Sequence, residues 1–220
     1  PPRSPFPACR RTKKPPVPRN NAAEPATLRM MLPDPATLWH YAVRYPLLAL
    51  LALIWAGFIL DFLTCKILRP VFGIHPRRFL SLPAIFTAPL LHVDLAHLLS
   101  NSIPLAILGF LSGDLLPPHQ FFLLLFIAIG GSGLGVWLFG RRAIMLGASG
   151  LVFALFGFLL AYAWFSRDKH ALFYAAAAFL LYGGLLLSLF KYRPQISWAA
   201  HIWGFAAGIL AAWWLTAYAV

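Results

Sequence analysis

The sequence predicts an all-α polytopic membrane protein with six transmembrane helices. Of its 220 residues, 60% are hydrophobic and 11% are charged, and the mean hydropathy is +0.75. This composition is too apolar for a water-soluble domain. The long apolar runs do not alternate with the period of two that barrel strands require, so we expect them to be helices.

Six apolar runs are each close to the roughly 20 residues that a helix needs to cross the hydrocarbon core. They lie at residues 40–62, 94–112, 120–139, 147–166, 171–190 and 198–217. Asp61 closes the first run, and residues 63–92 form the only long connection, a kind of segment that is commonly functional in compact domains. We therefore expect one membrane domain at residues 38–220.

Residues 1–37 are expected to be a basic, proline-rich tail that is disordered or not native. Residues 1–29 hold seven of the 18 Lys and Arg and show no helical periodicity. Met30 and Met31 follow. The tail is therefore interpreted either as a cytoplasmic segment or as translated sequence upstream of the start.

The formal net charge of +12 favours basic residues that flank the membrane over nucleic-acid binding. The basic residues lie in the tail, in loops or at the ends of the runs, and no basic face carries interleaved aromatic residues. The two cysteines, Cys9 and Cys65, support neither a disulfide framework nor a zinc site. We expect no nucleic-acid partner and no cofactor.

Chain direction alone places three polar motifs on one side of the membrane. His97, Ser149 and His201 lie near the N-terminal ends of the second, fourth and sixth runs. Even-numbered spans all begin on the side opposite the chain N-terminus. Because a polar group at bilayer depth is costly, this arrangement predicts a shared functional site.

Ser149 is the candidate nucleophile of this site. It lies in the run Gly147-Ala148-Ser149-Gly150, which opens the fourth span. The backbone N–H groups of a helix N-terminus favour a developing negative charge, and flanking glycines allow a substrate backbone to approach closely. Considered alone, the serine is better explained as part of a small-residue packing face. That face consists of Gly150, Ala154, Gly157 and Ala161.

His201 supplies a candidate base at the start of the sixth span. Gly204 and Gly208 follow at three and seven residues, so all three lie on one stripe of the helix. A glycine stripe lets another helix approach, and the small-residue face after Ser149 is the expected partner. Such contact would bring the imidazole within reach of the hydroxyl, whereas a lone histidine would be expected to bond a carbonyl.

His97 and Asn101 are spaced i, i+4 on one face of the second span, and both can donate hydrogen bonds to an oxyanion. His92 is expected in the preceding loop, where it would brace the site. As metal ligands these residues are a poor set, because Asp94 is the only acidic residue nearby and no cysteine is close. We expect no metal site.

A carboxylate partner for His201 is not predicted. The acidic residues of the chain are Glu24, Asp34, Asp61, Asp94, Asp114 and Asp168. None of them lies in the fourth or sixth run beside Ser149 or His201. The sequence therefore favours a Ser–His dyad, in which packing orients the base.

Over residues 40–217 the chain resembles the rhomboid intramembrane serine proteases. The family signatures are H-x4-H-x3-N in the second helix, G-x-S-G at the start of the fourth and A-H-x2-G-x3-G in the sixth. They match His92/His97/Asn101, Gly147–Gly150 and Ala200-His201 with Gly204 and Gly208. The resemblance implies a six-helix rhomboid-like bundle, with Ser149 as nucleophile and His201 as general base. It also implies an oxyanion hole formed by His97, Asn101 and the Ser149 backbone N–H.

Two departures from the family pattern concern substrate preference and loop structure. Many members carry a tyrosine four residues after the serine, stacked on the catalytic histidine, and this chain has Phe153 there. The Trp-Arg pair common in the first loop is absent, although Arg77-Arg78 lies in the same connection. Neither departure removes a catalytic group.

By this resemblance we expect a serine endopeptidase that cleaves in or near transmembrane segments of membrane proteins. The alternative is a non-catalytic rhomboid-like protein that binds membrane clients, but such relatives typically lack the serine or the histidine. A transporter would need a polar pathway through both leaflets, whereas the polar groups gather in one. The oligomeric state is left open.

The expected location is a bacterial inner membrane, with the active site opening to the outer side. With a cytoplasmic N-terminus, ten basic residues lie inside and eight outside, or three against eight if the chain begins at Met30. The positive-inside rule therefore gives little support, and this orientation depends on the resemblance.

Overall fold

The computed structural model describes residues 34, 37, 44–189 and 198–218. It divides into two units, residues 1–38 and 39–220. In the first unit, the backbone N–H of Thr37 donates to Asp34 Oδ1 at 2.9 Å. The rest of the predicted tail lies outside the described residues, so its boundary at residue 37 stays a prediction.

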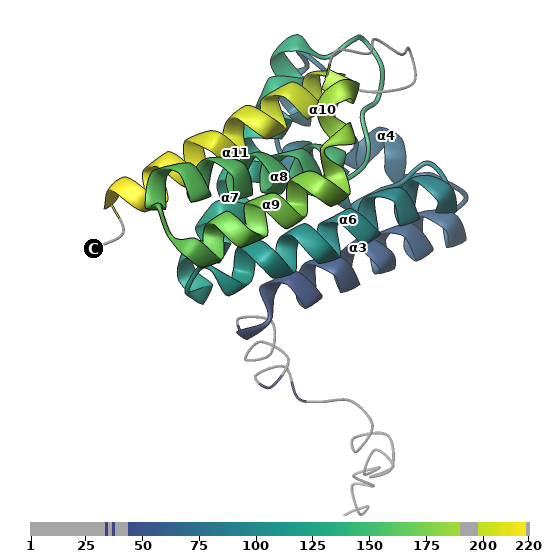
Figure 1. Cartoon of the computed structure of the whole chain (residues 1–220). Helices are drawn as coiled ribbons and strands as arrows, with labels where there is room; N and C mark the ends of the chain where they lie inside the picture. The colour runs from purple at the N-terminus through teal and green to yellow at the C-terminus, as the bar shows by residue number, and fades with distance from the viewer. Residues whose placement is uncertain (1–33, 35–36, 38–43, 190–197, 219–220) are drawn as a thin grey trace, which may run out of the picture. The chain divides into compact units, whose positions relative to one another are not determined.

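The second unit is a bundle of α-helices (Figure 1). Five helices are long and apolar enough to cross a membrane. They are α3 (Pro46–Leu63), α6 (Leu95–Asp114), α7 (Pro118–Phe139), α8 (Ser149–Ser166) and α11 (Trp198–Tyr218). The described residues contain no strand beyond an isolated bridge between Ile74 and Met145. The predicted all-α membrane bundle is confirmed.

The predicted count of six single spans is not confirmed, because the expected fifth span at 171–190 is divided. Helix α9 (Lys169–Tyr182) ends before Gly183, and the short α10 (Gly184–Leu189) follows. Each glycine in a helix interior is less favourable than alanine by about 1 kcal/mol, so the Gly183-Gly184 pair is a weak point where the helix is interrupted. The boundaries of α6, α7, α8 and α11 agree with the predicted runs to within two residues.

Two helix starts in this bundle are capped by aspartate side chains. Asp94 Oδ1 accepts the backbone N–H of His97 at 2.7 Å and begins α6. Asp168 Oδ2 accepts the N–H of Ala171 at 2.8 Å and begins α9. Both carboxylates satisfy donors that the first helical turn leaves unpaired, and their charge is favourable at a helix N-terminus.

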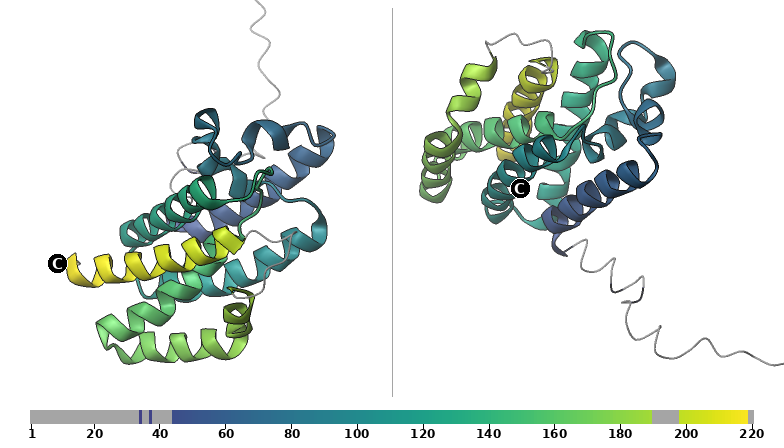
Figure 2. Two further views of the ribbon diagram at one scale, coloured as in Figure 1. Left: turned by 90° about the horizontal axis from the view of Figure 1, so that it is seen from above. Right: turned by 90° about the vertical axis from the view of Figure 1, so that its right-hand side faces the viewer.

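Helix α8 lies inside the bundle, where it contacts α6, α7, α9 and α11. The views in Figure 2 show α11 running along it on one side. Of the α8 residues, 61% are buried, against 17% of those in α3. The first residue of α8, Ser149, is therefore held by protein rather than by lipid.

Glycines bring α8 and α11 into backbone contact. A Cβ atom on Gly204 would meet the carbonyl oxygen of Gly150, and one on Gly208 would meet that of Ala154. A Cβ on Gly157 of α8 would lie 2.6 Å from the carbonyl oxygen of Phe205. The contact between the fourth and sixth runs that the glycine spacing predicted is confirmed.

The connection between α3 and α6 is folded into short helical pieces. They are α4 (Leu68–Phe72), η1 (Phe79–Ser81), α5 (Ala84–Thr87) and η2 (Ala88–Leu90). Residue Ala88 accepts the backbone N–H of Gly147 at 3.0 Å. The long loop is thereby joined to the segment that leads into Ser149.

Candidate active site

The starts of α6 and α8 meet at Gly147. Its backbone has φ +107°, a conformation that favours glycine. A Cβ atom at this position would lie 2.6 Å from His97 Cε1 and 3.4 Å from Asn101 Nδ2. The side chains of His97 and Asn101 therefore pack against the turn that precedes Ser149.

Asn101 brings an unused hydrogen-bond donor to this turn. Its side chain is buried, with 5% exposed. Within the described part of the chain its Nδ2 atom has no hydrogen-bond partner. A buried donor without a partner is costly in a native protein, and it is what a site prepared for a developing negative charge requires.

Ser149 is the first residue of α8, with Ala148 at the N-cap. The backbone N–H of Val152 donates to the Ala148 carbonyl at 3.1 Å. The N–H groups of the residues before Val152 precede the intrahelical hydrogen bonds, as at every helix N-terminus. The half-buried Ser149 thus lies among backbone donors that favour negative charge.

His201 lies over the same face of α8. Its ring stacks on Phe153, with ring centroids 4.0 Å apart and planes inclined by 15°. Phe153 is four residues after Ser149, so the two side chains share one face of the helix. Because Gly204 contacts Gly150, the start of α11 is held close to the start of α8. The structure therefore brings together the residues that the sequence singled out in three separate helices.

The acidic residues between positions 44 and 189 have other partners. Asp61 pairs with Arg69, Asp94 and Asp168 cap helices, and Asp114 accepts the Tyr174 hydroxyl at 2.7 Å. His201 is buried, and its Nδ1 atom has no hydrogen-bond partner among the described residues. Nor do the described residues hold any group of three or more His, Cys, Asp or Glu that could bind a metal ion. The carboxylates in this part of the chain are therefore engaged with groups other than His201.

His92 lies behind this site, in the loop before α6. Its Nε2 atom accepts the backbone N–H of Ala148 at 3.4 Å. Its ring lies edge-on to that of His97, with centroids 5.1 Å apart. The side chain is fully buried. His92 thus connects the residue before Ser149 to the loop, in the bracing position that was expected of it.

Arg69 and Asp61 extend this support, and the sequence analysis did not assign them to the site. Arg69 Nε lies 2.7 Å from Asp61 Oδ2. Its Nη2 atom donates to the carbonyls of His92 and Val93 at 3.1 and 3.0 Å. The available signal was Asp61 itself, because a carboxylate at the end of a membrane run needs a partner, and Arg69 follows eight residues later.

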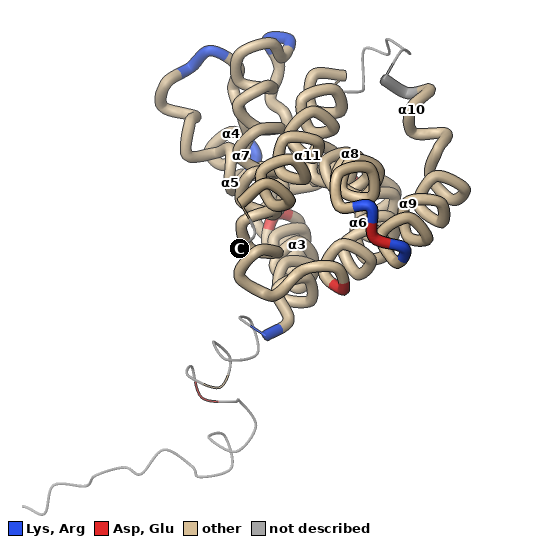
Figure 3. Tube along the Cα trace, turned by 60° about the vertical axis from the view of Figure 1, so that its left-hand side comes forward, with Lys and Arg blue, Asp and Glu red and all other residues tan. Residues whose placement is uncertain are grey.

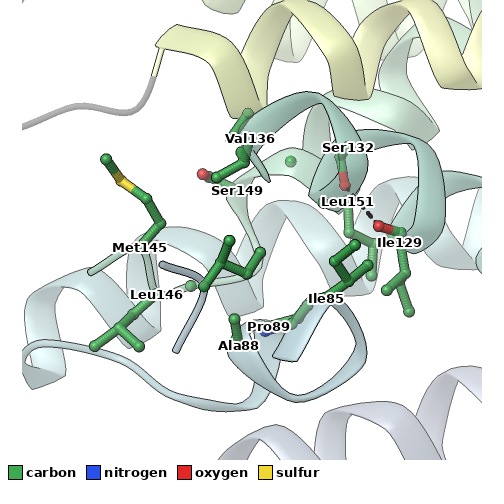
Figure 4. Close-up of a pocket in the computed structure, with 15 residues that line it drawn as sticks. Ile85, Ala88, Pro89, Ile129, Ser132, Val136, Met145, Leu146, Ser149 and Leu151 are labelled. Carbon is green, nitrogen blue, oxygen red and sulfur yellow. Dashed lines mark hydrogen bonds between the residues drawn. The ribbon is translucent and has the colours of Figure 1, made fainter. Parts of the chain in front are cut away.

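A small cavity of about 40 Å³ opens beside Ser149 (Figure 4). Its lining is mainly apolar and includes Ile74, Ile85, Val136, Met145 and Leu151. The second hydroxyl in the wall is that of Ser132, which donates to the Ile129 carbonyl at 3.3 Å. The cavity has room for a water molecule or a methyl-sized group. Ser132 was not singled out from the sequence, because a serine within an apolar helix gives no spacing signal.

Residues 80–218 match the family model of the Rhomboid domain. The chain belongs to the rhomboid family. This rhomboid is also similar to uncharacterized proteins of Mycobacterium bovis and Mycobacterium tuberculosis. Each is 36% identical over 154 residues, which cover 66% of this chain and 64% of the relative. An uncharacterized protein of Mycobacterium leprae is 32% identical over 139 residues, covering 59% of this chain and 55% of the relative.

The chain spans less than two thirds of the length of these relatives. The matched domain includes every motif of the candidate active site, from His92 to Gly208. Asp61 and Arg69 precede it. The rhomboid is a multi-pass integral membrane protein, as its five apolar helices indicate.

Acidification is expected to destabilise this rhomboid through His92. Burial and, to a smaller extent, the neighbouring His97 lower the pKa of His92, and a hydrogen bond with the Leu90 backbone partly offsets them, so that the pKa falls from 6.5 to about 4. Between pH 6.5 and pH 4 the unfolded chain binds a proton at His92 that the folded chain does not. Folding stability from this group is therefore fully present above pH 6.5 and is lost as the pH falls toward 4.

Thermal unfolding in detergent at a series of pH values from 7.5 to 4 measures this effect. The wild-type midpoint should fall with pH more steeply than that of His92→Asn, whose amide oxygen keeps an acceptor for Ala148 without titrating. His119→Asn, at an exposed histidine, is the matched control and should behave as wild type. Equal slopes for wild type and His92→Asn would contradict the prediction.

Proposed function

We propose that this rhomboid is an intramembrane serine endopeptidase, which hydrolyses peptide bonds in or near transmembrane segments with a Ser149–His201 dyad. The observation that carries the proposal is the stack of His201 on Phe153, on the α8 face that also bears Ser149. A second, independent observation supports the proposal: beside the same turn, the buried Asn101 Nδ2 atom has no hydrogen-bond partner among the described residues.

In this mechanism His201 removes the proton from the Ser149 hydroxyl as its oxygen attacks the substrate carbonyl carbon. The resulting oxyanion accepts hydrogen bonds from Asn101 Nδ2, the His97 ring and the Ser149 backbone N–H. His201 then protonates the leaving amine, which breaks the peptide bond and leaves an acyl-enzyme. A water molecule, deprotonated by His201, hydrolyses that ester and restores the serine.

Packing takes the place of a carboxylate in orienting the base. Phe153 holds the imidazole plane by stacking, and Gly204 lets α11 approach until the ring reaches α8. The cavity of about 40 Å³ beside Ser149 supports a water molecule or a small substrate side chain next to the scissile bond. A large side chain there would require the wall to move.

We place the site on the outer side of a bacterial inner membrane. The mycobacterial relatives support a bacterial membrane, and the family resemblance supports a cytoplasmic N-terminus. Helices α6, α8 and α11 then begin on the outer side, and the site opens there.

The test is incubation of the purified full chain in detergent with a single-span membrane protein, followed by mass analysis of the products. A peptidase gives two fragments, whose masses show that one peptide bond within or near the span was cleaved. The alternative function, client binding without cleavage, gives an intact substrate that co-purifies with the rhomboid. Both Ser149 and His201 are present, which favours the peptidase.

Replacing Asn101 with alanine is expected to lower turnover about 10²-fold, the usual loss for one oxyanion donor. The Michaelis constant should change much less, because the donor acts mainly in the transition state. Ser102→Ala is the matched control, because it removes from the next residue of α6 a buried hydroxyl that has no hydrogen-bond partner in the described part of the chain. If Asn101→Ala strongly lowers the unfolding temperature together with the activity, Asn101 has a structural role instead.

A further inference from the structure

A polar pocket of about 460 Å³ lies between two loops, away from Ser149. One loop precedes η1 and the other joins α7 to α8. The lining residues are His75, Pro76, Arg77, Arg78, Arg142, Ala143 and Ile144. We call it the basic loop pocket. Figure 3 shows Lys and Arg in blue gathered on loops at the top of the view.

The walls of the basic loop pocket are held by hydrogen bonds. Ile74 and Met145 exchange backbone bonds of 3.1 and 2.9 Å, which join the two loops. The Trp137 indole Nε1 donates to the Arg78 carbonyl at 3.0 Å. The Ser81 hydroxyl donates to the same carbonyl at 2.9 Å. The arginines are therefore carried by a preformed backbone, which reduces the ordering entropy that a ligand must offset.

Arg77 adopts an unusual backbone conformation, with φ 62°. Its Nη1 atom donates to the carbonyls of Leu138 and Gly140 at 3.1 and 2.8 Å. A left-handed conformation is uncommon for a residue other than glycine, and such strain is concentrated at functional sites. The consequence here is that the guanidinium bridges the end of α7 and fixes one side of the pocket.

The charge of the pocket is not neutralised by neighbours. None of the described residues that line it carries a carboxylate. Among the described residues, the exposed side chains of Arg78, Arg141 and Arg142 form no ion pair. Several guanidinium groups around one cavity without a carboxylate favour an anion, and the planar fork of arginine suits a phosphate group.

The residues next to the basic loop pocket are apolar and exposed. Phe79 is 77% and Leu80 is 99% exposed, directly after Arg78. The Phe79 ring lies 5.4 Å from that of Trp137. A tryptophan such as Trp137 beside arginine is typical of the level where headgroups meet acyl chains, and exposed Phe and Leu side chains are suited to the acyl chains. This pairing distinguishes a lipid phosphate from a free anion, because the free anion gains nothing from Phe79 and Leu80.

We propose that the basic loop pocket binds the phosphate of an anionic phospholipid, in the leaflet on the side where α6, α8 and α11 begin. Arg78 and Arg142 contact the headgroup, and Phe79 and Leu80 lie among its acyl chains. The proposal does not depend on proteolysis. The positive-inside rule predicts few basic residues on the outer side. Binding of an anionic lipid there accounts for the four arginines at positions 77, 78, 141 and 142.

The experiment titrates short-chain phosphatidylglycerol into the purified full chain in a neutral detergent, with bound lipid followed by native mass spectrometry. Each basic residue near an anionic surface contributes about 1 kcal/mol, so Arg78→Gln/Arg142→Gln should weaken the apparent Kd about 30-fold. Arg44→Gln/Lys169→Gln removes the same charge from exposed sites outside the pocket and should change the Kd less than twofold. Raising the salt concentration should weaken wild-type binding.

Two further arms separate the sources of phosphate. Phosphatidylcholine of equal chain length should bind much more weakly than phosphatidylglycerol, and inorganic phosphate should not compete at the same concentration. Equal binding of the two lipids, or full competition by inorganic phosphate, would overturn the proposal. So would an unchanged Kd in Arg78→Gln/Arg142→Gln. If that double variant does not fold, Arg142→Gln alone decides, with about a fivefold effect expected.

Discussion

Replacing Ser149 or His201 with alanine is expected to lower the turnover of peptide hydrolysis by a factor of at least about 10⁴. Without the hydroxyl there is no atom to form the acyl-enzyme, and without the imidazole the hydroxyl keeps its proton. The double variant should be no worse than either single variant, because the two groups act as one unit. Fragment yield from a single-span substrate measures the loss.

Thermal unfolding separates chemistry from folding in this experiment. Ser149→Ala removes one oxygen from a half-buried position, so its midpoint should stay near that of wild type. His201→Ala also removes the ring that stacks on Phe153, and His201→Phe is the better match because it keeps the stack. Substantial cleavage by Ser149→Ala or by either His201 variant would rule out the dyad.

Replacing Gly204 or Gly208 with valine is expected to stop cleavage without changing a reactive group. A Cβ atom at each position would meet a backbone carbonyl oxygen of α8, that of Gly150 or that of Ala154. Backbone cannot rotate away as a side chain can, so α8 and α11 must separate. Overpacking of this kind typically destabilises by about 1–3 kcal/mol, and more where no side chain can yield.

The control for this prediction is Gly130→Val in α7, where an added Cβ meets nothing within 4 Å. Its unfolding midpoint and cleavage rate should stay close to those of wild type. Gly208 is seven residues after His201, about two helical turns away. A loss of activity in Gly208→Val therefore results from the separation of α8 and α11 and not from a direct change beside His201. Wild-type cleavage rates in both the Gly204 and Gly208 variants would mean that this packing does not assemble the site.

The five long helices of this rhomboid could be predicted from sequence because each is a long apolar run with a polar or proline boundary. The contact between α8 and α11 was also predictable, since the glycines at 204 and 208 leave backbone as the only contacting surface. The division of the fifth span at Gly183 was missed. Hydropathy does not distinguish one continuous helix from two short helices separated by a glycine.

The support behind the site was less predictable than the site itself. His97 and Asn101 have a helical spacing, whereas the bond from Arg69 to the His92 carbonyl joins residues 23 positions apart through a folded loop. The helical turns of that loop are short and depend on tertiary contacts, such as the bond from Gly147 to Ala88. Local sequence patterns carry no information about such contacts.

The length of α8 sets the depth that we expect for Ser149 in the membrane. The 18 residues of α8 span about 27 Å, which is shorter than a hydrocarbon core of about 30 Å. The 22 residues of the neighbouring α7 span about 33 Å, which is longer than that core. A helix of this length that faced lipid would make the bilayer around it thinner. Because protein surrounds α8, its shortness need not deform the bilayer. We therefore expect Ser149, the first residue of α8, to lie below the membrane surface, with water reaching it from the side on which α8 begins.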